Sequence, residues 1–204
     1  MKLYYAPGTV SVAVAIALHE AGLDFDTHKL SFADAEQTKP EYHSVNPKGR
    51  VPALDTGDGV VTETGAILDY IAAIAPDAGL MPDAPIDAAR VRSVIQYLAS
   101  TMQVNHAHGP RASRWAMEEA SQADMRAQVP KTMTASAAFV EEHCLTGPFV
   151  MGDRVTIADA HLFIMCTWLK GDRVEVSAFP RIIAFLDAME ARESVKAVRA
   201  AGML

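Results

Sequence analysis

The chain has 204 residues, half of them hydrophobic, and its 18 basic and 25 acidic residues give a formal net charge of −7. This length and composition are typical of a globular protein with one large domain or two small ones. The acidic balance argues against nucleic acid or an anionic membrane surface as the main partner. No apolar run is long enough to span a bilayer, so we expect no membrane partner.

The first 75 residues alternate between strand and helix patterns, in the order βαβ, a variable segment, then ββα. Gly22 is a good end for the first helix, and the residues GDG form the turn of the last hairpin. The predicted elements are a strand at 2–6, a helix at 11–22, a strand at 24–32, two short strands within 51–63 and an amphipathic helix at 64–75.

The remainder of the chain is predicted to be helical. The stretch 76–86, PDAGLMPDAPI, has the composition of a linker. We therefore expect an α/β domain at 1–76, a linker at 77–86 and an all-α domain at 87–204. Apolar spacing then predicts a helix carrying the stripe Val91, Val94, Ile95, Leu98 and Met102, and further helices at 123–145, 156–169, 179–192 and 194–202.

Two of these helices carry further signals. Pro130 is expected to kink the helix at 123–145. The helix at 156–169 is apolar nearly all round, which predicts that it is the central buried helix. Its start, Thr156 followed by Asp159, resembles a capping box with Asp in place of Glu.

The cysteines and histidines do not form a metal-binding pattern. Cys144 and Cys166 form no CxxC pair, and Cys166 lies in the apolar run LFIMCTWL. The start of the chain, MKLYYAPG, lacks the basic segment and long apolar stretch of a secretory signal. We therefore expect no metal, and a reducing compartment, the cytoplasm.

The stretch NPKGRVPAL, residues 46–54, places a proline inside an apparent strand. Proline cannot donate to a strand ladder, which leaves two interpretations for Pro52. It is either a plain turn residue or a fixed cis bond that turns the edge groups of the strand toward a ligand.

Four stretches in this order and spacing resemble the cytosolic glutathione transferases, with the bacterial beta class as the nearest: LYYAPGTVS, NPKGRVPAL, TETGAILDYIA and GDRVTIADAHLF. The resemblance covers essentially the whole chain. It implies a thioredoxin-like domain with a cis bond at Val51-Pro52, followed by an all-α domain. It also implies a homodimeric detoxification enzyme with glutathione as co-substrate and a small, hydrophobic electrophile as second substrate.

The resemblance also implies a glutathione site. The backbone N–H and C=O of Val51, exposed by the cis bond to Pro52, would pair with the cysteinyl part of glutathione. Glu63 would accept the α-ammonium, and Thr64 at a helix start would bind the α-carboxylate. Arg50 is either near the glycyl carboxylate or simply a solvated charge.

Catalysis requires the thiolate of glutathione. Lowering a thiol pKa from about 8.5 to about 6.5 requires about 2.7 kcal/mol, and a helix N-terminus supplies only about 0.3–1 kcal/mol. A directed donor is therefore expected. Ser11 is our first choice, Thr9 the second and Tyr5 the third.

The second half of the site is expected from the fourth helix and the loop after it. His106 matches a beta-class histidine that lines the cleft and would polarise the sulfur or the substrate; otherwise it is a core histidine. The segment HGPRASRWAMEE could supply Trp115, Arg111 and Arg114 to the mouth of the electrophile site.

The sequence departs from the beta class at several positions. Val10 replaces the class cysteine, which excludes a mixed disulfide at that position. Ala107 replaces a lysine, and Ala99 and Val104 stand where the class has polar residues that reach across the dimer. The alternatives are therefore a non-catalytic ligand-binding or interaction protein on this fold, or a glutathione-dependent isomerase, reductive dehalogenase or ether-cleaving enzyme.

Overall fold

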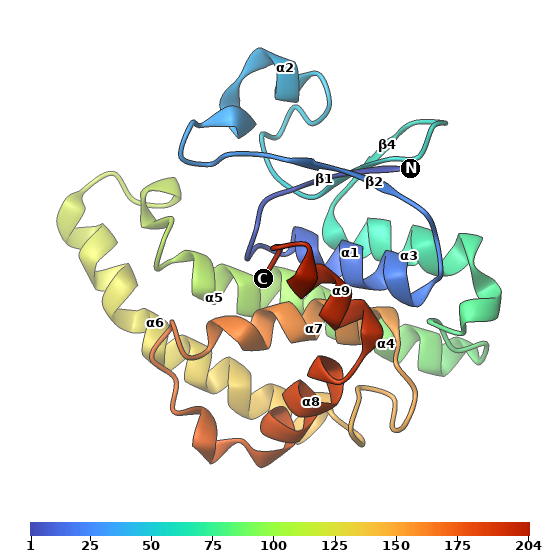
Figure 1. Ribbon diagram of the computed structural model, residues 1–204. Coiled ribbons are helices and arrows are strands. Elements are labelled where there is room, and N and C mark those ends of the chain that lie inside the picture. The colour runs from blue at the N-terminus through green and yellow to red at the C-terminus, as the bar shows by residue number, and fades with distance from the viewer.

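The computed structural model describes residues 1–204, and its first third is built around a four-stranded mixed sheet (Figure 1). The strand order is β2-β1-β3-β4. The parallel pair β1 and β2 is joined through a helix, and the other neighbours are antiparallel. In register, Leu3 faces Leu54, and Leu54 faces Val61. The strands are β1 Lys2–Tyr5, β2 Asp26–Lys29, β3 Ala53–Asp55 and β4 Val60–Thr62.

Helices cover both faces of the sheet. α1 (Ser11–Glu20) and α3 (Thr64–Ile74) lie between the sheet and the helical part, and the short α2 (Pro40–His43) lies on the far side (Figure 1). Every residue of α1 from Ser11 to Leu18 is buried. This burial follows because α1 packs on the sheet, on α3 and on two C-terminal helices, α7 (Ile157–Trp168) and α9 (Glu193–Ala200).

The rest of the chain is helical, and none of its helices combines the length and apolar character needed to cross a membrane. α4 runs through a π-helical turn, Leu98–Met102, into α5, and α6 ends in a second such turn, Val140–Cys144. The helices are α4 Pro85–Tyr97, α5 Gln103–Ala107, α6 Glu119–Phe139, α7 Ile157–Trp168, α8 Pro180–Glu190 and α9 Glu193–Ala200, with short 3-10 turns at Glu36–Thr38, Pro76–Ala78, Ala112–Arg114 and Val176–Ala178.

The expected fold class is confirmed, including the cis peptide bond at Val51-Pro52. The strand expected at 24–32 is shorter, because only Asp26–Lys29 pair with β1. Pro130 lies inside α6 without ending the helix. The boundaries 1–76, 77–86 and 87–204 remain a prediction.

α7 is the central helix of the C-terminal part, as its apolar sequence predicted. Every residue from Ile157 to Cys166 is buried. The carboxylate of Asp159 accepts hydrogen bonds from the backbone N–H and hydroxyl of Thr156, at 2.7 and 2.8 Å, and from the N–H of Val150 at 2.8 Å. The capping box is therefore confirmed, and it also ties the preceding loop to the helix start.

His161 is the exception in this well-paired helix. It is fully buried, and neither ring nitrogen has a hydrogen-bond partner. Burial disfavours the charged imidazolium and lowers the pKa of His161 to about 4. In the unfolded chain this histidine takes up a proton near pH 6.5, whereas in the folded protein it stays neutral down to about pH 4. The free energy of unfolding is therefore highest above pH 6.5 and decreases as the pH falls from 6.5 toward 4.

We predict that the His161→Leu variant has a weaker acid dependence of its stability than the wild type. Between pH 7 and pH 4 the wild type should lose up to about 3 kcal/mol more unfolding free energy than the variant. Urea denaturation of both proteins across this range measures the difference. If the unfolding free energies of the two proteins change with pH in parallel, the lowered pKa of His161 would be contradicted, even if the two proteins differ by a constant amount.

Candidate active site

A cleft of about 460 Å³ lies where the sheet domain meets the end of α5. Its walls come from the β1–α1 loop at 8–10, the segment 49–51, the segment 110–114 and the side chains of His106 and Trp168. Thus the cleft is formed by segments far apart in the sequence. The site residues expected from the sequence that line it are Thr9, Arg50, Val51, His106, Arg111 and Arg114.

Two hydroxyls and a free amide occupy the start of α1. Thr9 lines the cleft, and its hydroxyl lies 2.6 Å from that of Ser11 and 2.8 Å from the carbonyl of Ala6, to which it donates. Ser11 is fully buried beneath it, 3.2 Å from both the N–H and the carbonyl of Ala6. The N–H of Val10, at the helix start, has no acceptor within the chain. Thr9, rather than Ser11, therefore faces the cleft.

The segment before β3 presents unpaired backbone. The carbonyl of Arg50 is held by the Tyr42 hydroxyl at 2.7 Å and by the amide of the buried Asn46 at 2.6 Å. The next residue, Val51, lines the cleft, and neither its N–H nor its C=O makes a hydrogen bond within the chain. A strand edge of this kind can accept a short extended peptide by backbone pairing.

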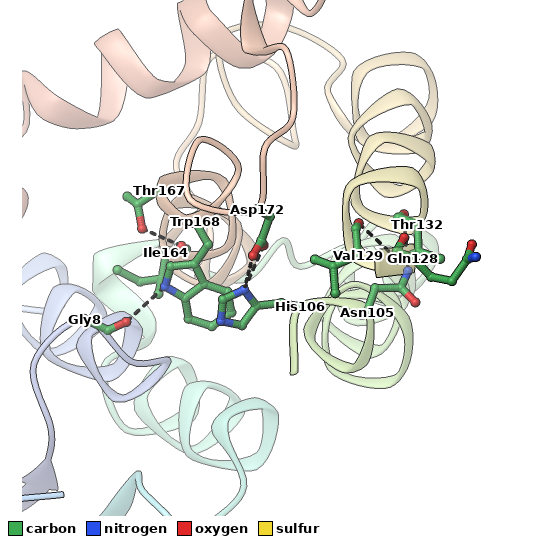
Figure 2. A network of polar contacts seen from close by, with 10 residues as sticks. All are labelled: Gly8, Asn105, His106, Gln128, Val129, Thr132, Ile164, Thr167, Trp168 and Asp172. Carbon is green, nitrogen blue, oxygen red and sulfur yellow. Dashed lines mark hydrogen bonds and ion pairs between the residues drawn. The ribbon is translucent and has the colours of Figure 1, made fainter. Parts of the chain in front are cut away.

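His106 belongs to a polar network that joins the two halves of the molecule (Figure 2). Its Nδ1 lies 2.8 Å from the carboxylate of Asp172, and its ring stacks on Trp168 with centroids 4.1 Å apart. The indole N–H of Trp168 in turn donates to the carbonyl of Gly8 at 3.0 Å. The network therefore fixes the imidazole and also ties the β1–α1 loop to the end of α7.

Three of the other expected residues lie outside the cleft, and two more lie at the start of α3. Tyr5 is buried in the core, Pro52 is buried, and Trp115 is half-exposed beside His108. Thr64 is the first residue of α3 and Glu63 precedes it, with the exposed Glu63 carboxylate 2.5 Å from the ammonium of Lys48. The start of α3 thus offers a carboxylate, a hydroxyl and free helix N–H groups next to β4.

The cleft is strongly basic although the protein is acidic. Arg50, Arg111 and Arg114 line it, and no Asp or Glu does. The guanidinium of Arg111 lies 5.5 Å from the ring centre of Phe32, a residue of the sheet domain. Burial lowers the pKa of Arg111 and of Arg114, and the neighbouring guanidinium charges lower both further.

Sequence reasoning missed part of this site. In the sequence, Trp168 is part of an apolar helical stretch, and neither Phe32 nor Asp172 belongs to a motif. Trp168 ends α7, where an aromatic residue at the exposed end of a buried helix could have marked it. The contact between Asp172 and His106 had no local signal, because 66 residues separate them.

Comparison with known proteins identifies the family. Residues 1–73 match the glutathione S-transferase N-terminal domain, and residues 110–201 match the glutathione S-transferase C-terminal domain. Glutathione S-transferase GstA of Escherichia coli O157:H7 is 33% identical over 199 residues, covering 96% of each chain. The chain belongs to the glutathione S-transferase family.

Solved structures of other glutathione transferases have the same fold. A glutathione transferase homologue from Sulfitobacter, crystallised with bound glutathione, is 56% identical with a TM-score of 0.98, over 100% of this chain and 98% of that one. The beta-class glutathione S-transferase of Sphingomonas chungbukensis is 30% identical with a TM-score of 0.86, over 100% of both chains.

In the present structure, no group of three or more His, Cys, Asp or Glu side chains is arranged to hold a metal ion.

We predict that Trp168→Phe loosens the β1–α1 loop. Phenylalanine retains an aromatic face for His106 but removes the donor to Gly8, a hydrogen bond worth about 1 kcal/mol. Amide hydrogen exchange in the peptide covering residues 6–10 should become about fivefold faster. Trp115→Phe is the matched control, since that indole donates no hydrogen bond within the chain. Equal exchange in both variants would contradict the tethering role.

Proposed function

We propose that this glutathione transferase binds glutathione along Val51, stabilises its thiolate at the start of α1 and transfers it to an electrophile in the cleft. The observation that carries the proposal is the unpaired backbone of Val51, which lines the same cleft as Thr9. The cysteinyl backbone of glutathione would pair with it as an added strand. This pairing places the sulfur toward the free amide of Val10.

The γ-glutamyl end of glutathione would extend to the start of α3. Thr64 and the free N–H groups of that helix end would bind the α-carboxylate. Glu63 would accept the α-ammonium, either beside Lys48 or in its place, because both cations need the same exposed carboxylate. In the opposite direction along the peptide, Arg50 would pair with the glycyl carboxylate.

We propose Thr9 as the hydroxyl that contacts the sulfur. Ser11 is buried below it, at 2.6 Å, and can take over the hydrogen bond to the Ala6 carbonyl. The Thr9 proton is then free to turn to the thiolate, and the Val10 N–H donates alongside it. Ser11 becomes a positioning residue, and Tyr5, buried in the core, has no contact with the sulfur.

The reaction needs a bound thiolate and a nearby electrophile. Loss of the thiol proton to solvent leaves the thiolate, whose sulfur forms a bond to the electrophilic carbon while the leaving group departs with its electron pair. His106 donates its Nδ1–H to Asp172 and would present Nε2 to the reacting groups, because Asp172 and Trp168 hold its ring at the cleft wall. Val10 replaces the cysteine of the beta class, so no disulfide step is included.

The assembly and location are also proposed. We infer a homodimer, as the resemblance to the beta class implies, and a cytoplasmic location. Two free, buried cysteines, Cys144 and Cys166, are compatible with a reducing compartment.

Binding and turnover are tested together. The protein should be retained on immobilised glutathione and eluted by free glutathione. It should also convert a generic chlorinated nitroarene in the presence of glutathione. Retention without turnover would favour the non-catalytic ligand-binding alternative. Failure of both would contradict glutathione binding altogether.

We predict that Thr9→Ala raises the pKa of bound glutathione by about one pH unit or more, the worth of a hydrogen bond to a charged sulfur. The ultraviolet absorbance of the bound thiolate at neutral pH should fall accordingly. Ser11→Ala should have a smaller effect in the same direction, because it only supports Thr9. Thr134→Ala, on the exposed face of α6, is the control. A larger effect of Ser11→Ala would return the donor role to Ser11.

A further inference from the structure

Three cations of the cleft have no partner within the chain. The side chains of Arg50, Arg111 and Arg114 make no ion pair and donate no hydrogen bond, and no carboxylate lines the cleft with them. Of the other eight arginines, seven donate at least one side-chain hydrogen bond, and four of these form ion pairs, for example Arg192 with Glu20 and Arg199 with Glu190. Arg50 and Arg114 are exposed and Arg111 is half-buried. Clustered guanidinium groups repel one another, and an anion bound among them would relieve this repulsion.

The geometry holds one of these groups firmly. The guanidinium of Arg111 lies over the ring of Phe32, so the segment 110–114 of the helical part contacts the sheet domain at the cleft. A guanidinium stacked on an aromatic ring keeps its N–H donors free at the edge. These donors match the two oxygens of a carboxylate.

Glutathione alone does not use all three cations. In the proposed pose its α-carboxylate lies at the start of α3, away from the arginines, and its glycyl carboxylate pairs with Arg50. Arg111 and Arg114, both from the helical part, are left facing the space where the second substrate would bind.

We propose that the electrophile of this transferase carries a carboxylate, bound by Arg111 and Arg114 while its reactive carbon faces the glutathione sulfur. This inference rests on the proposed glutathione function and refines the expectation of a purely hydrophobic electrophile. The stacked rings of His106 and Trp168 line the same cleft, so the rest of the substrate can be planar or apolar.

Two matched electrophiles test the proposal: 4-chloro-3,5-dinitrobenzoate and the corresponding carboxamide. In both, the glutathione sulfur bonds to C4, and chloride leaves with the electron pair of the broken bond. The ring and the leaving group are the same, and the side group differs in charge. Each kcat/KM is divided by the uncatalysed rate constant with glutathione at the same pH, which removes the difference in intrinsic reactivity.

The wild type should prefer the carboxylate by about tenfold or more on this scale, as expected for charge-assisted hydrogen bonds. Arg111→Gln and Arg114→Gln should each reduce that preference by about tenfold, mainly through KM for the benzoate, with much less change for the carboxamide. Lys131→Gln, which removes an exposed positive charge on α6 outside the cleft, should keep the wild-type preference. Circular dichroism and thermal melting verify that each variant is folded.

The possible failures are distinguishable. A wild type without carboxylate preference, or a preference that survives both arginine variants, would overturn the inference and leave the glutathione function intact. Weaker glutathione binding in both variants, with equal losses for the two electrophiles, would overturn it by assigning the arginines to glutathione. A wild type that neither binds glutathione nor converts either compound would overturn the proposed function as well.

Discussion

The burial of α1 on all sides is the constraint on which the rest of the structure depends. This helix packs between the sheet and α7, so its position is fixed by both halves of the molecule (Figure 1). A helix of small and β-branched residues from Ser11 to Ala17 permits that close approach. Because its N-terminus opens at the cleft, packing in the core determines where the free amide of Val10 and the hydroxyl of Thr9 lie.

The connection between the halves continues in the polar contacts around the cleft. The carbonyl of Gly8 accepts from the indole of Trp168, and its N–H donates to the carbonyl of Met203 near the C-terminus. The N–H and the C=O of Gly8 are thus both hydrogen-bonded to distant parts of the chain. Since His106 stacks on the same indole, the loop and the imidazole are positioned by a single side chain.

The cleft is positively charged although the protein as a whole is negatively charged. The chain carries a net charge of −7, yet the cleft is lined by three arginines and no carboxylate. Acidic groups nearby are used elsewhere: Asp172 faces His106, and Glu63 faces Lys48. A basic cleft in an acidic protein concentrates anionic ligands locally while the remaining surface keeps its negative charge.

Local patterns in the sequence determined the element order, the capped start of α7 and the family, since these depend on short-range spacing and on motifs of a few residues. The cis bond before Pro52 followed only from the resemblance to that family, because the local sequence also fits a plain turn. Thr9 and Ser11 were recognised in the same way, but the burial of Ser11 and the exposure of Thr9 to the cleft were not, because burial is a property of packing. The pairing of His106 with Asp172, the stack of Arg111 on Phe32 and the bond from Trp168 to Gly8 were decided only by the tertiary structure. Each of these contacts joins residues more than 60 positions apart, and no local periodicity records which distant side chain will complete a hydrogen bond or leave a charge unpaired.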